Sequence, residues 1–171
     1  MHTLIALLRA VNVGGTSKLP MAELRAMAEA EGFGAVRTYI RSGNLVFETD
    51  RGQDHVKTAL ETRLEAYAGR PVGVILRTAE EMSAILAANP FPDAERSKVG
   101  VLFLDAAPPP DTCDAAKWHA DEEIALGTRE VFVHYPSGMG RTKLRLPAMA
   151  DGTMRNVNTV AKLADMVGRR E

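Results

Sequence analysis

The first 77 residues alternate short apolar runs with amphipathic stretches, and this order limits the folds that the chain can adopt. Four runs are short and rich in apolar or β-branched residues, as strands are; they lie at residues 3–8, 36–40, 45–48 and 72–76. The run at 3–8 is uninterrupted, which is typical of a strand buried on both faces. Two helical patterns separate the strands, the first from Leu19 to Gly32 and the second from about 53 to 67. The order βαββαβ predicts a ferredoxin-like α/β plait.

The second half of the chain resembles the first in its order of elements. It has a helix that begins near Thr78, a candidate N-cap. Further strands are predicted at 98–104, 122–126 and 130–135, and further helices at 111–118 and 157–167. This βαββα order is that of a plait that lacks its final strand or has a helix in its place. We therefore predict an α+β fold of two tandem ferredoxin-like plaits, residues 1–77 and 78–171. No residue-level repeat relates the halves, and periodicity leaves open whether they share one core.

Composition and charge exclude several classes of protein. The chain is 46% hydrophobic and 25% charged, as globular proteins are and disordered chains are not. Its formal net charge of −1 gives no general attraction to nucleic acids or anionic membranes, so any anion site must be local. No apolar run approaches the roughly 18 residues of a membrane span, and the N-terminus lacks a signal-peptide pattern. We expect a cytoplasmic protein with no membrane partner.

The sequence predicts no metal and no cofactor. Its single cysteine, Cys113, forms neither an internal disulfide nor a cysteine zinc site, and we expect it to be a small buried hydrophobic residue in the helix at 111–118. The histidines are scattered without metal-ligand spacing; they are His2, His55, His119 and His134. Asp121 and Glu122 lie close to His119, and we interpret this cluster as a solvated loop before a hairpin.

Four ordered motifs extend from the start of the chain to its last helix. They are Leu7–Gly15, Arg37–Phe47, Gly140–Leu144 and Thr153–Leu163. Together they resemble the bacterial family catalogued as domain of unknown function 1697. The resemblance implies a tandem of two α/β plaits and no established activity. Val157 departs from the family pattern, in which a tryptophan follows the Arg-Asn pair.

A glycine-rich loop at residues 9–18 joins the first strand to the first helix. Backbone N–H groups of such a loop and the positive end of a helix dipole attract anions. Lys18 and Arg9 add positive charge. The glycine spacing matches neither the Walker phosphate loop nor the dinucleotide fingerprint. The alternative interpretation is a tight turn that needs positive φ at Gly14 or Gly15.

Three further segments combine cations with small polar residues. The loop at 137–143 resembles a phosphate cradle without the Walker spacing. The segment at 155–159 precedes or opens the last helix, where Asn156 or Asn158 is alternatively a helix cap. The segment at 41–44 is a hairpin turn that also carries a cation.

We expect these segments to bind an anionic ligand, a nucleotide or a nucleic-acid phosphate, at a shared cleft. The candidate binding residues are Arg9, Asn12, Gly14, Gly15, Lys18, Arg41, Asn44, Arg141, Lys143, Arg155 and Asn156. One alternative is an enzyme that acts on a small phosphorylated or acidic substrate, although the sequence nominates no general base. The other is a homo-oligomeric structural or interaction module, for which a homodimer is expected.

Overall fold

The computed structural model describes residues 1–9, 19–39 and 43–168. The chain divides into two compact units, which we describe separately. The first unit contains Met1–Glu81 and Asp165–Glu171, and the second contains Met82–Ala164. The end of the last helix therefore belongs to the same unit as the N-terminal residues.

The first unit is built on a four-stranded antiparallel sheet. Its elements are β1 (His2–Leu8), α1 (Met21–Ala30), β2 (Gly34–Tyr39), β3 (Asn44–Thr49), α2 (Gln53–Ala68) and β4 (Val74–Thr78). The strands lie in the order β2-β3-β1-β4, with β1 paired to both β3 and β4. The predicted succession of strands and helices in this half is the observed one.

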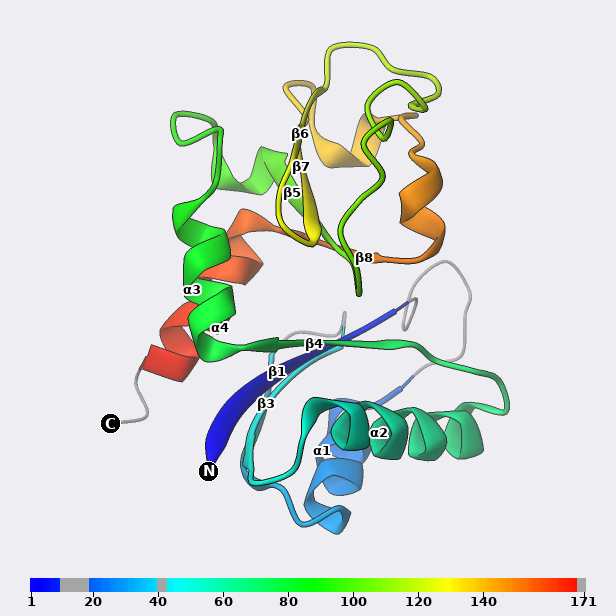
Figure 1. Cartoon of the computed structure of the whole chain (residues 1–171), viewed down its shortest axis with the longest axis vertical. Helices are drawn as coiled ribbons and strands as arrows, with labels where there is room; N and C mark the ends of the chain where they lie inside the picture. The colour runs from blue at the N-terminus through cyan, green and yellow to red at the C-terminus, as the bar shows by residue number, and fades with distance from the viewer. Residues whose placement is uncertain (10–18, 40–42, 169–171) are drawn as a thin grey trace. The chain divides into compact units, whose positions relative to one another are not determined.

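The core of the first unit lies between the sheet and two helices. Figure 1 shows α1 and α2 together on one face of the sheet. Successive strand residues point to opposite faces, so Leu4 and Leu8 of β1 enter the same apolar cluster as Leu24 of α1 and Leu60 of α2. β1 is buried without a break from Leu4 to Leu8. Burial of both faces explains why its sequence is a continuous apolar run.

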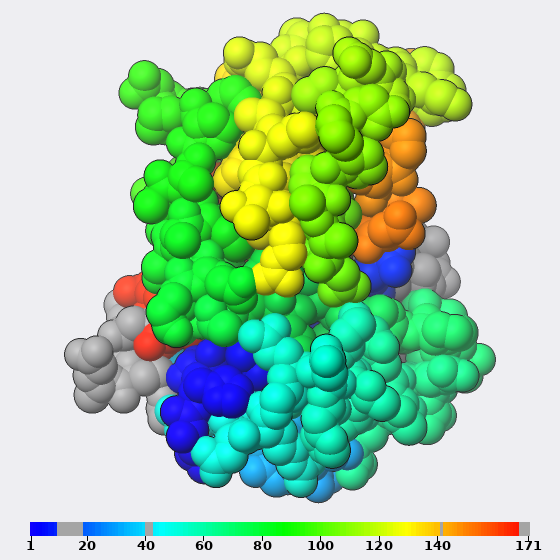
Figure 2. Space-filling view, in the orientation of Figure 1, coloured from blue at the N-terminus to red at the C-terminus, as the bar shows by residue number. Residues whose placement is uncertain are grey.

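The second unit is built on another four-stranded antiparallel sheet. Its strands are β5 (Val99–Phe103), β6 (Glu123–Leu126), β7 (Glu130–His134) and β8 (Thr153–Asn156), in the order β6-β7-β5-β8. The division between the units falls within α3 (Ala79–Ala87), after Glu81, and within α4 (Val157–Gly168), before Asp165. The second unit also contains the 3₁₀ turns η1 (Arg96–Lys98), η2 (Met139–Arg141) and η3 (Pro147–Ala150). The yellow atoms of Figure 2 show the β6–β7 hairpin at the surface of this unit, where β6 is an edge strand with exposed ends.

Thr78 begins α3 as its sequence predicted. The Glu81 N–H donates to Thr78 Oγ1 over 3.0 Å, and the Thr78 N–H donates to Glu81 Oε1 over 2.8 Å. Each side chain thereby satisfies a backbone donor that has no partner within the helix. This reciprocal pair is a capping box.

Two predictions for the second half are wrong. The segment at 111–118 forms turns and an isolated bridge, not a helix. In addition, the sheet does have a fourth strand, β8, directly before the last helix, where the prediction was a plait that lacks its final strand or has a helix in its place. A strand of four residues that runs directly into a helix leaves no turn residue between the two, so its boundary has no sequence signal.

The two sheets share one strand order. Adding four to each strand number in β2-β3-β1-β4 gives the order of the second sheet. The equivalence extends to single residues, because Arg77 of β4 lies opposite Ile5 while Arg155 of β8 lies opposite Val101. Both arginines are buried, and both donate from Nη1 to the carbonyl of the preceding residue. The chain thus contains a structural repeat that its residues alone do not reveal.

Candidate functional site

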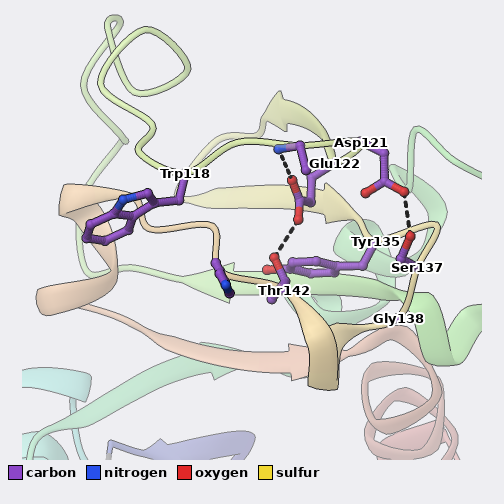
Figure 3. Close-up of a pocket in the computed structure, with 9 residues that line it drawn as sticks. Trp118, Asp121, Glu122, Tyr135, Ser137, Gly138 and Thr142 are labelled. Carbon is purple, nitrogen blue, oxygen red and sulfur yellow. Dashed lines mark hydrogen bonds between the residues drawn. The ribbon is translucent and has the colours of Figure 1, made fainter.

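A pocket of about 560 Å³ lies in the second unit, between the loop before β6 and the loop after β7. Its lining residues are Trp118, Ala120, Asp121, Glu122, Tyr135, Ser137, Gly138, Thr142 and Lys143. Figure 3 shows Trp118 at one end of this group, Asp121 with Ser137 at the other, and Glu122, Tyr135 and Thr142 between them. A volume of this size fits a small-molecule ligand.

Two backbone connections hold the loops in place. Lys117 and Arg145 form an antiparallel bridge, in which each N–H donates to the other carbonyl at 2.8 and 2.9 Å. The Tyr135 N–H donates to the Lys98 carbonyl at 2.7 Å, and Gly138 turns the chain with a φ of 92°. A positive φ of this size is readily adopted by glycine. The pocket walls are therefore fixed to the sheet although they lie outside its strands.

Trp118, at one end of the pocket, is an exposed aromatic residue with an unusual backbone conformation. The residue is 67% exposed, and its backbone φ is 55°. This left-handed conformation costs about 1–2 kcal/mol for a residue with a Cβ. An exposed aromatic ring on strained backbone is typical of a binding site rather than of a surface selected for stability.

Cations lie on the same side of the site as Trp118. A second hollow of about 410 Å³ is lined by Trp118, Thr142, Lys143 and Arg145. It adjoins the main pocket, since three of these residues line both. Lys143 and Arg145 are exposed. Their positive charges make this end of the site attractive to an anion.

Carboxylates lie farther from Trp118. Glu122 is only 5% exposed, and its two carboxylate oxygens accept hydrogen bonds from the Ala120 N–H at 2.8 Å and from Thr142 Oγ1 at 2.5 Å. The hydrogen bond from Thr142, more than any other contact, lowers the pKa of Glu122 below its usual value. Ser137 Oγ donates to Asp121 Oδ2 at 2.6 Å. Glu122 is therefore an ionised acceptor at neutral pH.

Tyr135 contributes a buried phenol to the same region. The residue is 3% exposed, and Figure 3 shows its ring near Glu122 with the hydroxyl end directed toward Thr142. Burial, reinforced by the negative charge of Glu122, raises the pKa of Tyr135 to about 12. Among the residues that the structure describes, none forms a hydrogen bond with this hydroxyl. The phenol thus stays protonated at neutral pH and keeps its O–H donor for a ligand.

The family described as "Protein of unknown function (DUF1697)" matches residues 1–132. The chain belongs to this family. The solved structure of the conserved bacterial protein SP0830 from Streptococcus pneumoniae is similar to that of this chain. It aligns with a TM-score of 0.79 and 25% identity, over 97% of this chain and 98% of that one. No curated protein matches the sequence.

Several predicted binding residues of this DUF1697 chain lie outside the described residues. They are Asn12, Gly14, Gly15, Lys18 and Arg41. Arg141 ends η2, and its side chain likewise lies outside the described part. The anion-loop hypothesis for residues 9–18 stays a prediction.

Two predicted residues have structural contacts in the first unit. Arg9 follows β1, where its N–H donates to the Gly73 carbonyl at 2.9 Å. Its side chain covers Gly73, since a Cβ there would come within 2.8 Å of Arg9 Cδ. Asn44 is fully buried and donates from Nδ2 to the Tyr39 carbonyl at 2.9 Å. Asn44 thereby closes the hairpin between β2 and β3.

The remaining predicted residues belong to the second unit. Arg155 is 6% exposed and donates to Thr153 Oγ1 and to the Met154 carbonyl, and burial lowers its pKa to about 10. Asn156 Oδ1 accepts the Thr159 N–H at 2.9 Å, so Asn156 acts as a cap of α4. Within the described ranges, Lys143 is the predicted residue that lines the pocket.

Most residues of the pocket were not predicted as binding residues. Trp118, Asp121 and Glu122 belong to a segment interpreted as a helix end and a solvated loop. Their signal was the one tryptophan of the chain beside three acidic residues, in a segment without apolar periodicity. The burial predicted for Cys113 is also wrong: the residue is exposed, because these turns bury the neighbouring Thr112 and direct Cys113 outward.

Metal and membrane features are lacking in the part of the chain that the structure describes. There, no three side chains of the His, Cys, Asp and Glu types gather in a way that would hold a metal ion. None of the described helices has the length and apolar character needed to cross a bilayer.

Proposed function

We propose that this chain binds a small anionic molecule that contains a ring, such as a nucleotide, in the pocket of the second unit. The observation that carries the proposal is the exposed, backbone-strained Trp118 beside Lys143 and Arg145. A ring of the ligand stacks on the indole, and its phosphate or other acidic group lies between the two cations.

The energetics favour such a ligand. Stacking on an aromatic side chain contributes about 1–3 kcal/mol, and hydrogen bonds to a charged group contribute about 1.5–3 kcal/mol. The Glu122 and Asp121 carboxylates repel an anion, so the acidic group of the ligand must lie at the Lys143 end. The two ends of the pocket therefore fix the direction in which the ligand binds.

The size of the pocket favours a small molecule over a nucleic-acid strand. About 560 Å³ is within the range of ligand cavities, roughly 300–1,000 Å³. A nucleic acid is usually bound along an extended basic surface, whereas this chain has a net charge of −1. Glu122 is an ionised acceptor with both oxygens engaged, so it is poorly suited to proton transfer.

The single tryptophan of the chain makes the test direct. All indole fluorescence comes from Trp118, so a ligand that stacks there changes the emission. We expect saturable quenching by a nucleoside monophosphate. Lys143→Ala and Arg145→Ala each weaken binding by roughly tenfold, the equivalent of about 1.4 kcal/mol. Lys162→Ala, which removes an exposed lysine from α4, is the matched control and leaves affinity unchanged.

Two outcomes contradict this proposal. One is unchanged emission in the presence of nucleotides, sugar phosphates and inorganic phosphate at millimolar concentration. The other is equal affinity in the wild type and in both cation variants.

We also propose that both units are ferredoxin-like plaits. The antiparallel order β4-β1-β3-β2, with two helices on one face, supports this assignment for the first unit. In the second unit the same strand order supports it, although turns replace the helix expected after β5. A crystal structure tests this assignment, and sedimentation equilibrium tests the predicted homodimer.

A further inference from the structure

We infer that the acidic end of the pocket recognises the hydroxyl groups of a sugar ring, so that the ligand is a ribonucleotide or a sugar phosphate. This inference rests on the proposed function, because it concerns the part of the same ligand that lies away from Lys143. The residues that carry it are Asp121, Glu122 and Tyr135.

The acidic end offers both a donor and acceptors. Tyr135 lines the pocket and is 3% exposed, Figure 3 shows its hydroxyl end directed toward Thr142, and no described residue takes its proton in a hydrogen bond. With a pKa of about 12, the hydroxyl is a donor at every physiological pH. Figure 3 shows Glu122 near the Tyr135 ring and Asp121 farther along the pocket, next to Ser137, and both carboxylates act only as acceptors once ionised.

A hydroxyl group is the ligand group that satisfies this combination. It accepts a hydrogen bond from Tyr135 and donates its own proton to a carboxylate. A phosphate cannot donate when fully ionised and is repelled by two carboxylates. An ammonium group has no lone pair and leaves the Tyr135 donor without a partner.

The polar side chains around these groups fit the same chemistry. Ser137 holds Asp121 through one carboxylate oxygen, Oδ2, and thereby orients the other, Oδ1. Thr142 and the Ala120 N–H hold one oxygen each of Glu122, so a ligand hydroxyl donates to a remaining lone pair of that carboxylate. A single carboxylate binds the hydroxyls of ribose in dinucleotide-binding folds. The two carboxylates of this pocket therefore offer acceptors for the hydroxyls of a sugar.

The hydroxyls of a nucleotide ribose and those of a free sugar phosphate present the same chemistry. The stacking surface of Trp118 favours a nucleotide, whose base covers the indole while its ribose reaches the acidic end. A sugar phosphate engages the cations and the carboxylates without the stacked base. The difference in affinity between the nucleotide and the sugar phosphate measures the contribution of the stacked base.

The experiment compares two ligands that differ only in these hydroxyls. Trp118 fluorescence is titrated with adenosine 5′-monophosphate and with its 2′,3′-dideoxy counterpart, and ribose 5-phosphate and inorganic phosphate are measured beside them. We expect the ribonucleotide to bind at least about tenfold more tightly than the dideoxy compound. Ribose 5-phosphate is expected to bind more tightly than inorganic phosphate.

Two variants test the assignment to residues. Tyr135→Phe and Asp121→Asn retain the shape of each side chain, and each is expected to reduce the ratio of ribonucleotide to dideoxynucleotide affinity toward one. Lys143→Ala weakens both ligands equally and leaves the ratio unchanged.

The possible failures are distinguishable. Equal binding of the ribonucleotide and the dideoxynucleotide overturns the hydroxyl inference and leaves the proposed function standing. The hydroxyl inference is also overturned if both variants keep the wild-type ratio of ribonucleotide to dideoxynucleotide affinity, because other residues then bind the hydroxyls. If no phosphate-bearing compound changes the emission, the proposed function and this inference fail together.

Discussion

Trp118 combines backbone strain with exposure, and this combination predicts a conflict between stability and binding. Replacing Trp118 with glycine relieves the left-handed strain at φ 55°. We expect the free energy of unfolding to rise by up to about 1 kcal/mol, since glycine also loses more chain entropy on folding. Urea denaturation measures this change, and calorimetric titration with a nucleotide is expected to show lost binding.

Ala35 provides the control for that substitution. It is exposed and has a φ of 47°, so Ala35→Gly relieves similar strain outside the pocket. We expect a similar gain in stability with unchanged binding. If Trp118→Gly retained full affinity, the indole would have no role in the site.

Tyr135 predicts a response to high pH. Its pKa of about 12 in the folded protein lies above the value of 10.0 for an unperturbed tyrosine. Between these values the unfolded chain releases the phenol proton while the folded chain retains it. Stability is therefore unaffected below about pH 10 and falls as the pH rises from 10 to 12. Ultraviolet titration at the phenolate band should show one of the three tyrosines ionising late, and Tyr135→Phe should remove that component.

At the scale of elements, Asn156 joins β8 to α4 by capping the helix. Asn156→Ala removes the acceptor for the Thr159 N–H, and loss of a cap costs about 1 kcal/mol. Asn156→Asp retains a good cap and is expected to preserve stability. Both are measured by thermal unfolding. Neither variant should change ligand affinity, because Asn156 does not line the pocket. A loss of affinity with unchanged stability would show that Asn156 takes part in ligand binding.

Elements with a clear periodicity were predictable from sequence, and short irregular ones were not. The run at β1 and the spacing of Val56, Leu60 and Leu64 in α2 identify a strand and a helix, because burial imposes the pattern. The four residues of β8 are too few to show a period. The prolines at 108–110 precede turns rather than a helix.

The candidate site was less predictable than the fold for a physical reason. Arg155 and Asn156 combine a cation with an amide, yet one is buried and the other caps a helix. Trp118 and Tyr135 are separated by a hairpin in the sequence and meet only because two loops fold beside one another. The sequence shows which polar side chains are present. Whether one of them can bind a ligand depends on whether it already forms hydrogen bonds within the fold.

At the scale of the whole molecule, Arg37 joins β2 to the end of α4, which belongs to the same unit. Its Nη2 donates to the Met166 carbonyl at 2.9 Å. Arg37→Ala removes this charged donor, for which we expect a loss of about 1.5–3 kcal/mol in local stability. Hydrogen–deuterium exchange should show faster exchange in peptides from the last turn of α4. Arg25→Ala, which removes an exposed arginine paired within α1 at 3.4 Å, is the control. Unchanged exchange in the Arg37 variant would contradict a stabilising role.

The return of Asp165–Glu171 to the first unit bears on how the protein is made. A ribosome delivers residues in order, so the N-terminal sheet emerges long before the segment that completes its unit. The first unit therefore cannot complete its fold until the entire second unit has been synthesised. During that interval the Arg37 side chain lacks its Met166 acceptor, and the N-terminal residues leave the ribosome exit tunnel before the fold of their unit is complete.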